Sequence, residues 1–265
     1  MIRRAAAVEY RGTADSGRNR PIKALAETND GSLVELYVKP SGRPELGFEG
    51  MANELFATCI AGQLGLPVCD PFLVEIIPEW IDTIPDTDVS AVLRQSCPIA
   101  FGSLSAGEGW KIWSPEEQAL GARRAIATGI FAFDAFTGND DRRAEKPNLL
   151  VKGDSLRIID HELCFYLRQK HFPRVAPWEL GNLSGLIHAE RHILGPVLKG
   201  DRFLNVEALR PSWAGLSNEC LADYEAAIPE QWGAAAAAIE EAVDHIRTVR
   251  DRIDECLDEV RRVLA

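Results

Sequence analysis

Residues 133–165 read FDAFTGNDDRRAEKPNLLVKGDSLRIIDHELCF and carry the clearest structural signal in the chain. Two short apolar segments, LLV at 149–151 and LRII at 156–159, flank the turn-forming sequence KGDS. This pattern predicts an antiparallel hairpin that is nearly symmetric about Asp154. In that register, Asn148 and Asp160 face each other with Cβ atoms roughly 5 Å apart.

The polar residues around this hairpin are of the types that handle magnesium and phosphate. Asn148 and Asp160 offer hard oxygen ligands, which suit Mg²⁺ together with waters and substrate phosphates. Asp141 or its neighbour Asp140 lies just upstream, where one carboxylate could orient or deprotonate a hydroxyl that attacks a γ-phosphate. Asp and Asn also flank ordinary hairpins because they favour turns, so the pattern alone leaves a purely structural role open.

Length and composition set the broad class of the protein. The chain has 265 residues and is 46% hydrophobic, which suffices for a substantial core in one bilobal domain or two small ones. The formal net charge of −11 argues against a general nucleic-acid binder or a protein of anionic membranes. Six cysteines form no CxxC pair and no apolar stretch follows the opening MIRR, so we expect reduced thiols and a cytoplasmic protein without membrane spans.

The N-terminal part is predicted to be a twisted antiparallel sheet. Its alternating apolar segments are separated by loops rich in Gly, Arg, Asn and Asp, and they lie at 5–10, 21–27 and 32–39. The first loop contains Gly17 and Arg18. Its backbone N–H groups and the arginine could cover a polyphosphate, although Gly-containing hairpin loops are commonplace.

A lysine and a glutamate lie fifteen residues apart in the sequence that follows. Lys39 ends the third predicted strand, and Glu54 lies on a helix predicted over 51–65. These two could form the ion pair that holds a kinase lysine against the α- and β-phosphates. The alternative is a pair of unrelated surface charges.

The middle of the chain is predicted to join a sheet to a helical part. The segments 68–77 and 96–104 look like the last strands of the small sheet. The sequence FGSLSAGEGW that begins at Phe101 and Gly102 is the expected hinge, where the edge of an adenine would meet backbone groups. A helix is then predicted from Ser114, as the N-cap of a capping box with Glu117, to about Thr137.

The C-terminal part is predicted to be helical. His188 and His192 have the i, i+4 spacing of two metal ligands on a helix, but no third ligand is evident, so we interpret them as surface or core residues. From Ala234 onward, strong helix formers and apolar positions at three- and four-residue steps predict a long helix. Packing onto its own domain is the favoured interpretation, with a homodimer as the alternative.

At these residues the chain resembles the HipA-like kinases, in particular their small bacterial branch. The resemblance spans roughly residues 8–165 and rests on six features: VKP at Lys39, NELFATCIAGQLGLPV with Glu54, FGS at 101–103, FDAF followed by NDDR at 139–142, KPNLL at 146–150 and LRIIDHE at 156–162.

The resemblance implies an α+β, bilobal protein-kinase-like fold that binds ATP and Mg²⁺. The N-lobe would span residues 1–104, with an antiparallel sheet and one helix, and the helical C-lobe residues 105–265. By this carry-over, Lys39 would contact phosphates and Glu54 would position it. Asp141 would be the catalytic aspartate, while Asn148 and Asp160 would hold the metal. The nucleotide would also meet Gly17, Arg18, Phe101 and Gly102.

The chain departs from the family pattern at one important position. In this kind of loop the metal-binding Asn usually comes five residues after the catalytic Asp, but Lys146 stands there and Asn148 comes two residues later. Asp140 therefore stays an alternative base. The sequence IDHE also replaces the DFG of ordinary protein kinases.

The expected activity is that of a protein serine/threonine kinase acting on an unidentified phosphoacceptor. Two alternatives stay open: a catalytically degenerate kinase-fold interaction module with a partner of the toxin and antitoxin type, and a small-molecule phosphotransferase. A related DR…N…D pattern in phosphatidylinositol 3-kinases makes a lipid kinase a more distant alternative, which the acidic composition disfavours.

Overall fold

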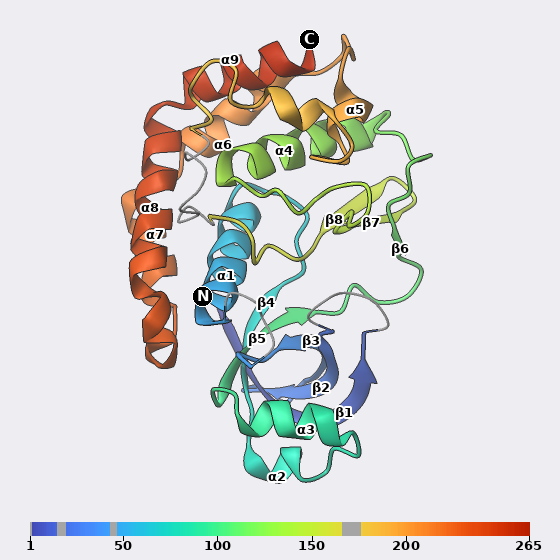
Figure 1. Ribbon diagram of the computed structural model, residues 1–265, viewed down its shortest axis with the longest axis vertical. Coiled ribbons are helices and arrows are strands. Elements are labelled where there is room, and N and C mark those ends of the chain that lie inside the picture. Colours follow the sequence, from blue (N-terminus) through green and yellow to red (C-terminus); the bar gives the residue numbers. More distant parts are fainter. Residues whose placement is uncertain (1, 15–19, 43–46, 166–175) are drawn as a thin grey trace.

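The computed structural model describes residues 2–14, 20–42, 47–165 and 176–265. It is a mixed α/β structure, with most strands in the N-terminal part of the chain and most helices in the C-terminal part. A five-stranded barrel lies at one end of the long axis, and the helices α4 (Ala122–Thr137) and α9 (Ile253–Leu264) lie at the other (Figure 1).

The barrel closes in the strand order β1-β2-β3-β5-β4. Four neighbouring pairs are antiparallel, but β1 and β4 are parallel, with Arg3 opposite Phe72 and Ala6 opposite Glu75. The prediction of a purely antiparallel sheet was therefore wrong at this pair. Closure removes the exposed sheet edges. The strand bounds are β1 Arg3–Thr13, β2 Ile22–Thr28, β3 Leu33–Lys39, β4 Pro71–Glu75 and β5 Ile99–Leu104.

Small and branched side chains that alternate along the strands fill the barrel. This period-two pattern places every second residue inside, and the buried residues include Ala5, Ala7, Ile22, Ala24, Ala26, Leu36, Val38, Phe72, Val74 and Ala100. Between β4 and β5, the polar stretch forms two short helices, α2 (Pro78–Ile81) and α3 (Thr87–Arg94). Asp86 caps α3 by accepting hydrogen bonds from the N–H groups of Asp88 and Val89, both at 3.0 Å.

Helix α1 (Gly47–Gln63) belongs to the second and larger apolar core. Its residues from Gly50 to Ala61 are all buried, because it packs against the β4–β5 side of the barrel and against the C-terminal helices. Figure 1 shows α1 between these two parts. The predicted helix was confirmed, and it begins four residues earlier than expected.

Helix α4 starts later than predicted. The expected capping box at Ser114 does not form: Ser114–Glu117 is a turn closed by the Glu117 N–H donating to the Ser114 carbonyl at 3.0 Å. Glu117 pairs instead with Arg123, at 2.5 Å. The helix begins after Gly121, whose φ of 57° favours glycine and interrupts a helical backbone. The predicted end at Thr137 was confirmed.

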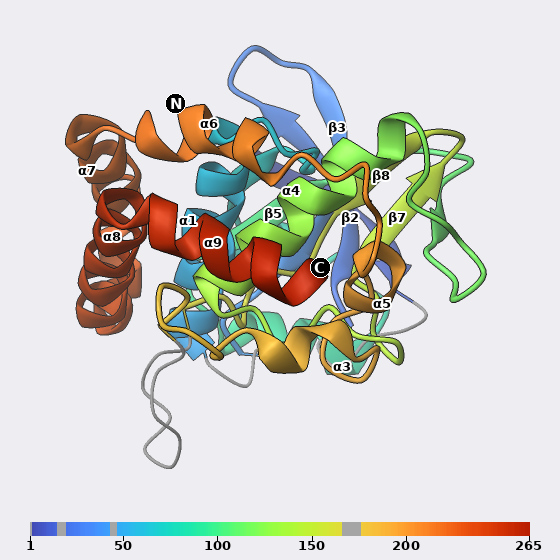
Figure 2. The same ribbon diagram turned by 90° about the horizontal axis from the view of Figure 1, so that it is seen from above.

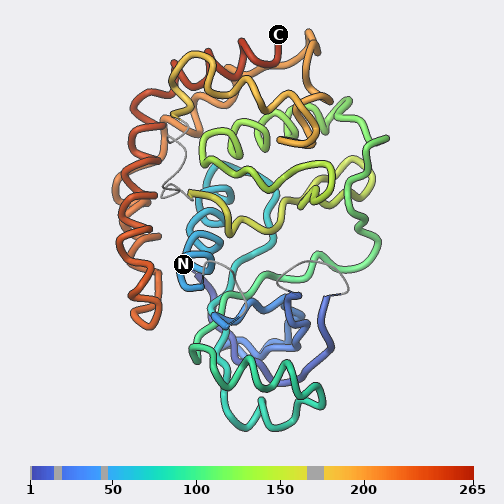
Figure 3. The backbone as a smooth tube through the Cα atoms, in the orientation of Figure 1, coloured from blue at the N-terminus to red at the C-terminus, as the bar shows by residue number. Residues whose placement is uncertain are grey.

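Before α4 the chain runs along the outside of the molecule and forms the short strand β6 (Lys111–Ile112), as the backbone trace in Figure 3 shows. This strand pairs with the predicted hairpin, made of β7 (Leu149–Lys152) and β8 (Ser155–Ile158). The hairpin lies between the barrel and α4 (Figure 1). It therefore brings the ends of its two strands toward the barrel strand that carries Lys39.

The C-terminal residues complete the larger core. Seen from above, α9 crosses α4 while α7 and α8 lie side by side at one edge (Figure 2). The remaining elements are η1 Ser184–Ile187, α5 Gly195–Leu198, η2 Val206–Leu209, α6 Arg210–Ala214, α7 Asn218–Ala226, η3 Glu230–Ala235 and α8 Ala236–Asp251.

Two predictions for this part were wrong. The single helix from Ala234 is interrupted at Arg252, whose backbone (φ −116°, ψ 31°) is not helical; this turn lets α9 lie on α4. His188 and His192 are not on a helix, since they lie between η1 and α5. The packing of the C-terminal helices onto their own chain was confirmed.

The six cysteines are all free thiols, four of them buried. Among the described residues, every helix is too short or too polar to cross a lipid bilayer.

Candidate functional site

Lys39 lies buried at the end of β3 and joins two carboxylates. It sits opposite Phe101 of β5, and its side chain is 10% exposed. The Nζ atom lies 2.6 Å from Glu54 Oε2 on α1 and 2.6 Å from Asp160 Oδ1 beyond β8. The ion pair between Lys39 and Glu54 that the sequence predicted is therefore formed, and it is a buried contact and not a pair of unrelated surface charges.

The hairpin has a different register from the one predicted. Leu149 pairs with Ile158 and Lys152 with Ser155, so the backbone partner of Asn148 is Ile159, whose N–H donates to the Asn148 carbonyl at 3.1 Å. The prediction that Asn148 and Asp160 face each other was wrong by one residue. The tight turn at Gly153 and Asp154 sets this register, since a hairpin's register follows from its turn.

Asn148 and Asp160 nevertheless have a common feature: both have left-handed backbones, with φ of 46° and 62°. Outside glycine this conformation is uncommon, although Asn and Asp adopt it more readily than other residues. It turns both side chains out of the regular strand pattern. Local strain of this kind often occurs at functional sites.

Asp141 is buried beside these residues, and Lys146 connects it to Asp160. The Lys146 Nζ atom lies 2.5 Å from Asp141 Oδ2 and 3.0 Å from Asp160 Oδ2. Asn148 Nδ2 donates to the same Asp141 oxygen at 3.2 Å. We call Lys39, Glu54, Asp141, Lys146, Asp160 and Glu162 the lysine–carboxylate cluster.

The two neighbouring aspartates have different surroundings. Asp140 is exposed and lies 3.6 Å from Arg191, also an exposed side chain. Asp141 is 4% exposed and belongs to the cluster. The geometry therefore favours Asp141 over Asp140 as the residue with a chemical role, which stays a prediction.

A buried polar network holds the loop 139–148 on helix α4. The Arg142 guanidinium, fully buried, donates to Asp134 Oδ2 at 2.5 Å and to the Asn148 carbonyl. Asp134 also accepts a hydrogen bond from Asn139 Nδ2 at 2.7 Å, and its Oδ2 lies 3.1 Å from His192 Nε2. Burial acts to raise the pKa of Asp134, but Arg142 and His192 outweigh it and hold that pKa well below its usual range.

This network explains His192 and sets the position of Asp141. His192 is a buried core residue, as the sequence interpretation allowed. The side-chain oxygen of Asn139 accepts from the Asp141 N–H at 3.1 Å, so helix α4 positions Asp141 through Asn139 and Asn148 through Arg142.

Glu162 and His161 complete the surroundings of Lys39. Glu162 lies 3.7 Å from the Lys39 ammonium, and His161 Nδ1 lies 3.2 Å from the Thr58 hydroxyl and 3.6 Å from Glu54. These contacts make His161 a hydrogen-bonding residue beside Glu54.

The cluster perturbs its own proton equilibria. Burial lowers the pKa of Lys39, but the carboxylates of Asp160, Glu54 and Glu162 outweigh it and raise that pKa above its ordinary value. For Asp160 the two effects have the opposite signs. Burial raises the pKa of this carboxyl, but Lys39 and Lys146 outweigh burial and hold the pKa below its usual range. Burial raises the pKa of Glu162 to about 7, with Asp160 and Glu54 adding to the rise and Lys39 opposing it.

The predicted nucleotide contacts have mixed outcomes. Gly17 and Arg18 lie outside the described residues. Phe101 is buried in the larger core, and Gly102 faces the barrel interior, where an added Cβ would lie 2.5 Å from Val74 Cγ2. Close packing thus accounts for the glycine, and contact of either residue with a nucleotide stays a prediction.

Sequence reasoning left out two members of the cluster, Lys146 and Glu162. Lys146 stands five residues after Asp141, at the position where the family pattern has the metal-binding Asn. That departure from the pattern was the sequence signal that Lys146 lies in the site. Glu162 follows Asp160 by two residues within the motif LRIIDHE. Nothing in the spacing indicated that it would face Lys39, because the chain leaves the strand at Ile158.

The donor set fits one hard divalent cation. Asn148 turns its Nδ2 atom toward Asp141 Oδ2 at 3.2 Å, so its amide oxygen is the atom that could coordinate a hard divalent cation. Carboxylate oxygens of Glu54, Asp160 and Glu162 also lie within 4.8 Å of one another. That second group surrounds the Lys39 ammonium, which neutralises one of its three carboxylates.

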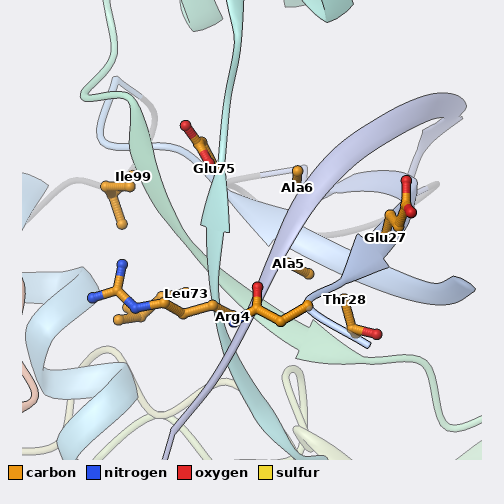
Figure 4. A pocket seen from close by; sticks show the side chains of 9 residues that line it. Arg4, Ala5, Ala6, Glu27, Thr28, Leu73, Glu75 and Ile99 are labelled. Atoms are coloured by element: carbon orange, nitrogen blue, oxygen red, sulfur yellow. The ribbon is translucent and has the colours of Figure 1, made fainter. Parts of the chain in front are cut away.

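A separate hollow of about 290 Å³ lies on the barrel, where β1, β2 and β4 meet (Figure 4). Its charged lining residues are Arg4, Glu27 and Glu75, and none of the cluster residues lines it. The mixed charges give no indication of a polyphosphate site.

Known proteins resemble the chain at the level of one solved structure and one protein family. Among solved structures, the chain is similar to CtkA, a proinflammatory kinase of Helicobacter pylori, with 12% identity and a TM-score of 0.45 over 99% of this chain and 97% of that chain. No curated protein matches the chain. The family model of the HipA-like kinases matches residues 8–173, which is more than half of the 265 residues. The chain therefore belongs to the HipA-like kinase family.

Proposed function

We propose that this protein is an ATP- and Mg²⁺-dependent phosphotransferase, and that its acceptor is a serine or threonine hydroxyl of another protein. Membership of the HipA-like kinases supports a kinase-type phosphotransferase. The observation that carries the proposed nucleotide and metal site is the buried contact of the Lys39 ammonium with both Glu54 and Asp160, each at 2.6 Å.

Each residue has a proposed part in the reaction. Glu54 holds Lys39 in place to contact the α- and β-phosphates, as the corresponding ion pair does in kinases. Asp141 accepts the proton of the attacking hydroxyl. Asn148 and Asp160 hold the metal, which when bound would neutralise charge on the phosphates. Buried polar donors held in fixed positions contribute more than they would in water.

The proposed organisation is bilobal, with an N-lobe of residues 1–104 and a C-lobe of residues 105–265. The separate apolar core of the barrel supports this division. The expected hinge began at Phe101, but Phe101–Leu104 belong to strand β5. The proposed hinge is therefore the rest of that segment, which includes Gly107 and Gly109. Helix α1 packs into the larger core, so Glu54 is anchored on the C-lobe side of Lys39.

Calorimetric titration with a non-hydrolysable ATP analogue tests the nucleotide site. We expect binding that requires Mg²⁺ in the wild-type protein and is lost in Asp160→Ala. Asp154→Ala is the matched control, because it removes the same carboxyl group from the exposed hairpin turn. The absence of binding to the wild-type protein with and without Mg²⁺ would contradict the proposal and favour an interaction module.

Phosphoryl transfer tests the role of Asp141. With radiolabelled ATP and lysate proteins as acceptors, Asp141→Ala should keep analogue binding and lose about 10²- to 10⁴-fold in transfer rate, the usual contribution of a general base. An unchanged rate would overturn the assignment of Asp141. Label found only on small molecules would instead identify a metabolite kinase.

A further inference from the structure

Lys146 has an unusual place in the cluster, because its ammonium lies between the two aspartates assigned to chemistry and to metal binding. It is 2.5 Å from Asp141 Oδ2 and 3.0 Å from Asp160 Oδ2. The other oxygen of Asp160 is held by Lys39 at 2.6 Å. Both oxygens of the predicted metal ligand thus already have a cationic partner.

The backbone fixes Lys146 in this position. Arg143 and Lys146 close a tight turn with two backbone hydrogen bonds, of 3.1 and 3.0 Å. The buried Arg142 within the same loop is tied to Asp134 and to the Asn148 carbonyl. Because the loop is held on both sides, the lysine side chain has little freedom to leave the aspartates, and its side chain is only 31% exposed.

The charge balance of the cluster limits how many metal ions it can take. Two ammonium groups, Lys39 and Lys146, and the Arg143 guanidinium, 3.9 Å from Asp141, face four carboxyl groups, those of Glu54, Asp141, Asp160 and Glu162. At most one negative charge is therefore in excess, so the cluster balances one divalent cation far better than two. Ordinary protein kinases hold two Mg²⁺ ions with the aspartate of the DFG motif and an asparagine of the catalytic loop.

We propose that the Lys146 ammonium is a built-in cation that takes the place of a metal ion between Asp141 and Asp160, so that the site accepts one divalent cation instead of two. The catalytic role of this cation rests on the proposed function. Its position rests on the contacts of Lys146 with Asp141 and Asp160.

Metal binding without nucleotide tests the inference independently of the proposed activity. The probe is Mn²⁺, titrated into the full chain and followed by electron paramagnetic resonance. The variants are Lys146→Asn, which supplies an amide ligand, and Lys146→Met, which removes the charge without supplying one. Lys152→Asn is the matched control, since this exposed lysine of β7 contacts the Glu108 carbonyl and lies outside the cluster.

We expect both Lys146 variants to bind Mn²⁺ about 10- to 100-fold more tightly than the wild-type protein, a range comparable to that produced by changes in the groups around metal ligands. Lys152→Asn should bind as the wild type does. Unchanged Mn²⁺ affinity in both Lys146 variants would overturn the proposal. A gain confined to Lys146→Asn would also overturn it, because the new ligand and not the released carboxylates would then explain the effect.

A second measurement uses the wild-type protein alone and does not depend on the folding of a variant. Acetylation of lysines by acetic anhydride, read by mass spectrometry, should label Lys146 at least tenfold more slowly than Lys152. Millimolar Mg²⁺ should leave that ratio unchanged, because the ammonium stays on its aspartates. Labelling of Lys146 as fast as Lys152 once Mg²⁺ is added would contradict the built-in cation. If the wild-type protein does not bind the ATP analogue in calorimetry, that result contradicts the proposed function. It does not bear on the Lys146 proposal, which Mn²⁺ binding and acetylation test without nucleotide.

Discussion

Replacing Arg142 by methionine should destabilise the protein strongly, because it removes the guanidinium that balances the buried Asp134 carboxylate and leaves that carboxylate to Asn139 and His192. Arg142 and Asp134 are both fully buried, and their contact is 2.5 Å. Removing one partner of a buried ion pair typically costs about 3–5 kcal/mol. For a chain of this size that corresponds to a fall in Tm of about 6–20 °C. Arg143→Met is the matched control, since its half-exposed side chain lies 3.9 Å from Asp141.

The pH dependence separates this explanation from a simple loss of packing. The pKa of Asp134 is lowered in the folded protein, so its contribution to stability is present above the ordinary carboxyl pKa of 3.8 and is lost as pH falls below it. In Arg142→Met the aspartate gains a proton more easily. The difference in the free energy of unfolding between wild type and variant should therefore be larger at pH 7 than at pH 4.

Urea denaturation at both pH values measures these differences, and the double variant Asp134→Asn/Arg142→Met completes the cycle. The double variant should lose less stability than the sum of the two single variants, because no uncompensated charge remains. A loss below about 1 kcal/mol in Arg142→Met, or an equal loss at both pH values, would refute the reasoning.

Three further predictions concern other parts of the chain. Gly102→Ala should cost about 1–3 kcal/mol by overpacking the barrel, since its Cβ would lie 2.5 Å from Val74 Cγ2; an unchanged Tm would mean that the barrel relaxes. The raised pKa of Glu162 makes wild-type stability fall as pH rises from 4.5 to about 7. Glu162→Gln should therefore gain up to about 2–3 kcal/mol relative to wild type between pH 5 and pH 8 in urea denaturation, and a constant difference would contradict this. Asp86→Ala should lose about 1 kcal/mol with the cap of α3, and equal unfolding midpoints in urea would show that the cap is dispensable.

Much of the fold follows from local patterns in the chain. The alternation of apolar residues placed the strands around Ala24 and Leu36, and the turn between Val151 and Leu156 produced the predicted hairpin, because these features depend on neighbours in sequence. The helix carrying Glu54 was found for the same reason. A lysine at the end of a strand followed by a glutamate on the next helix then predicted the ion pair between Lys39 and Glu54.

Other features depend on which surfaces meet in space. The capping box at Ser114 is a sound local motif, but Glu117 pairs with Arg123 and Gly121 sets the start of α4. The interruption at Arg252 follows the packing of α9 on α4 and not a weakness in helix propensity. The one-residue error in the hairpin register arose because the symmetry about Asp154 ignored the geometry of the turn.

In the candidate site, too, some features follow from the sequence and others from the tertiary structure. The residue types and order of Lys39, Glu54, Asp141, Asn148 and Asp160 are properties of the sequence, and they sufficed to predict a phosphate- and metal-handling chemistry. Only the tertiary structure decided that Asp141 is buried while Asp140 is exposed, and that Lys146 lies between two aspartates. The physical reason is that charge balance and desolvation depend on groups from distant parts of the chain, here the end of β3, helix α1 and the loop after α4, which no local pattern brings together.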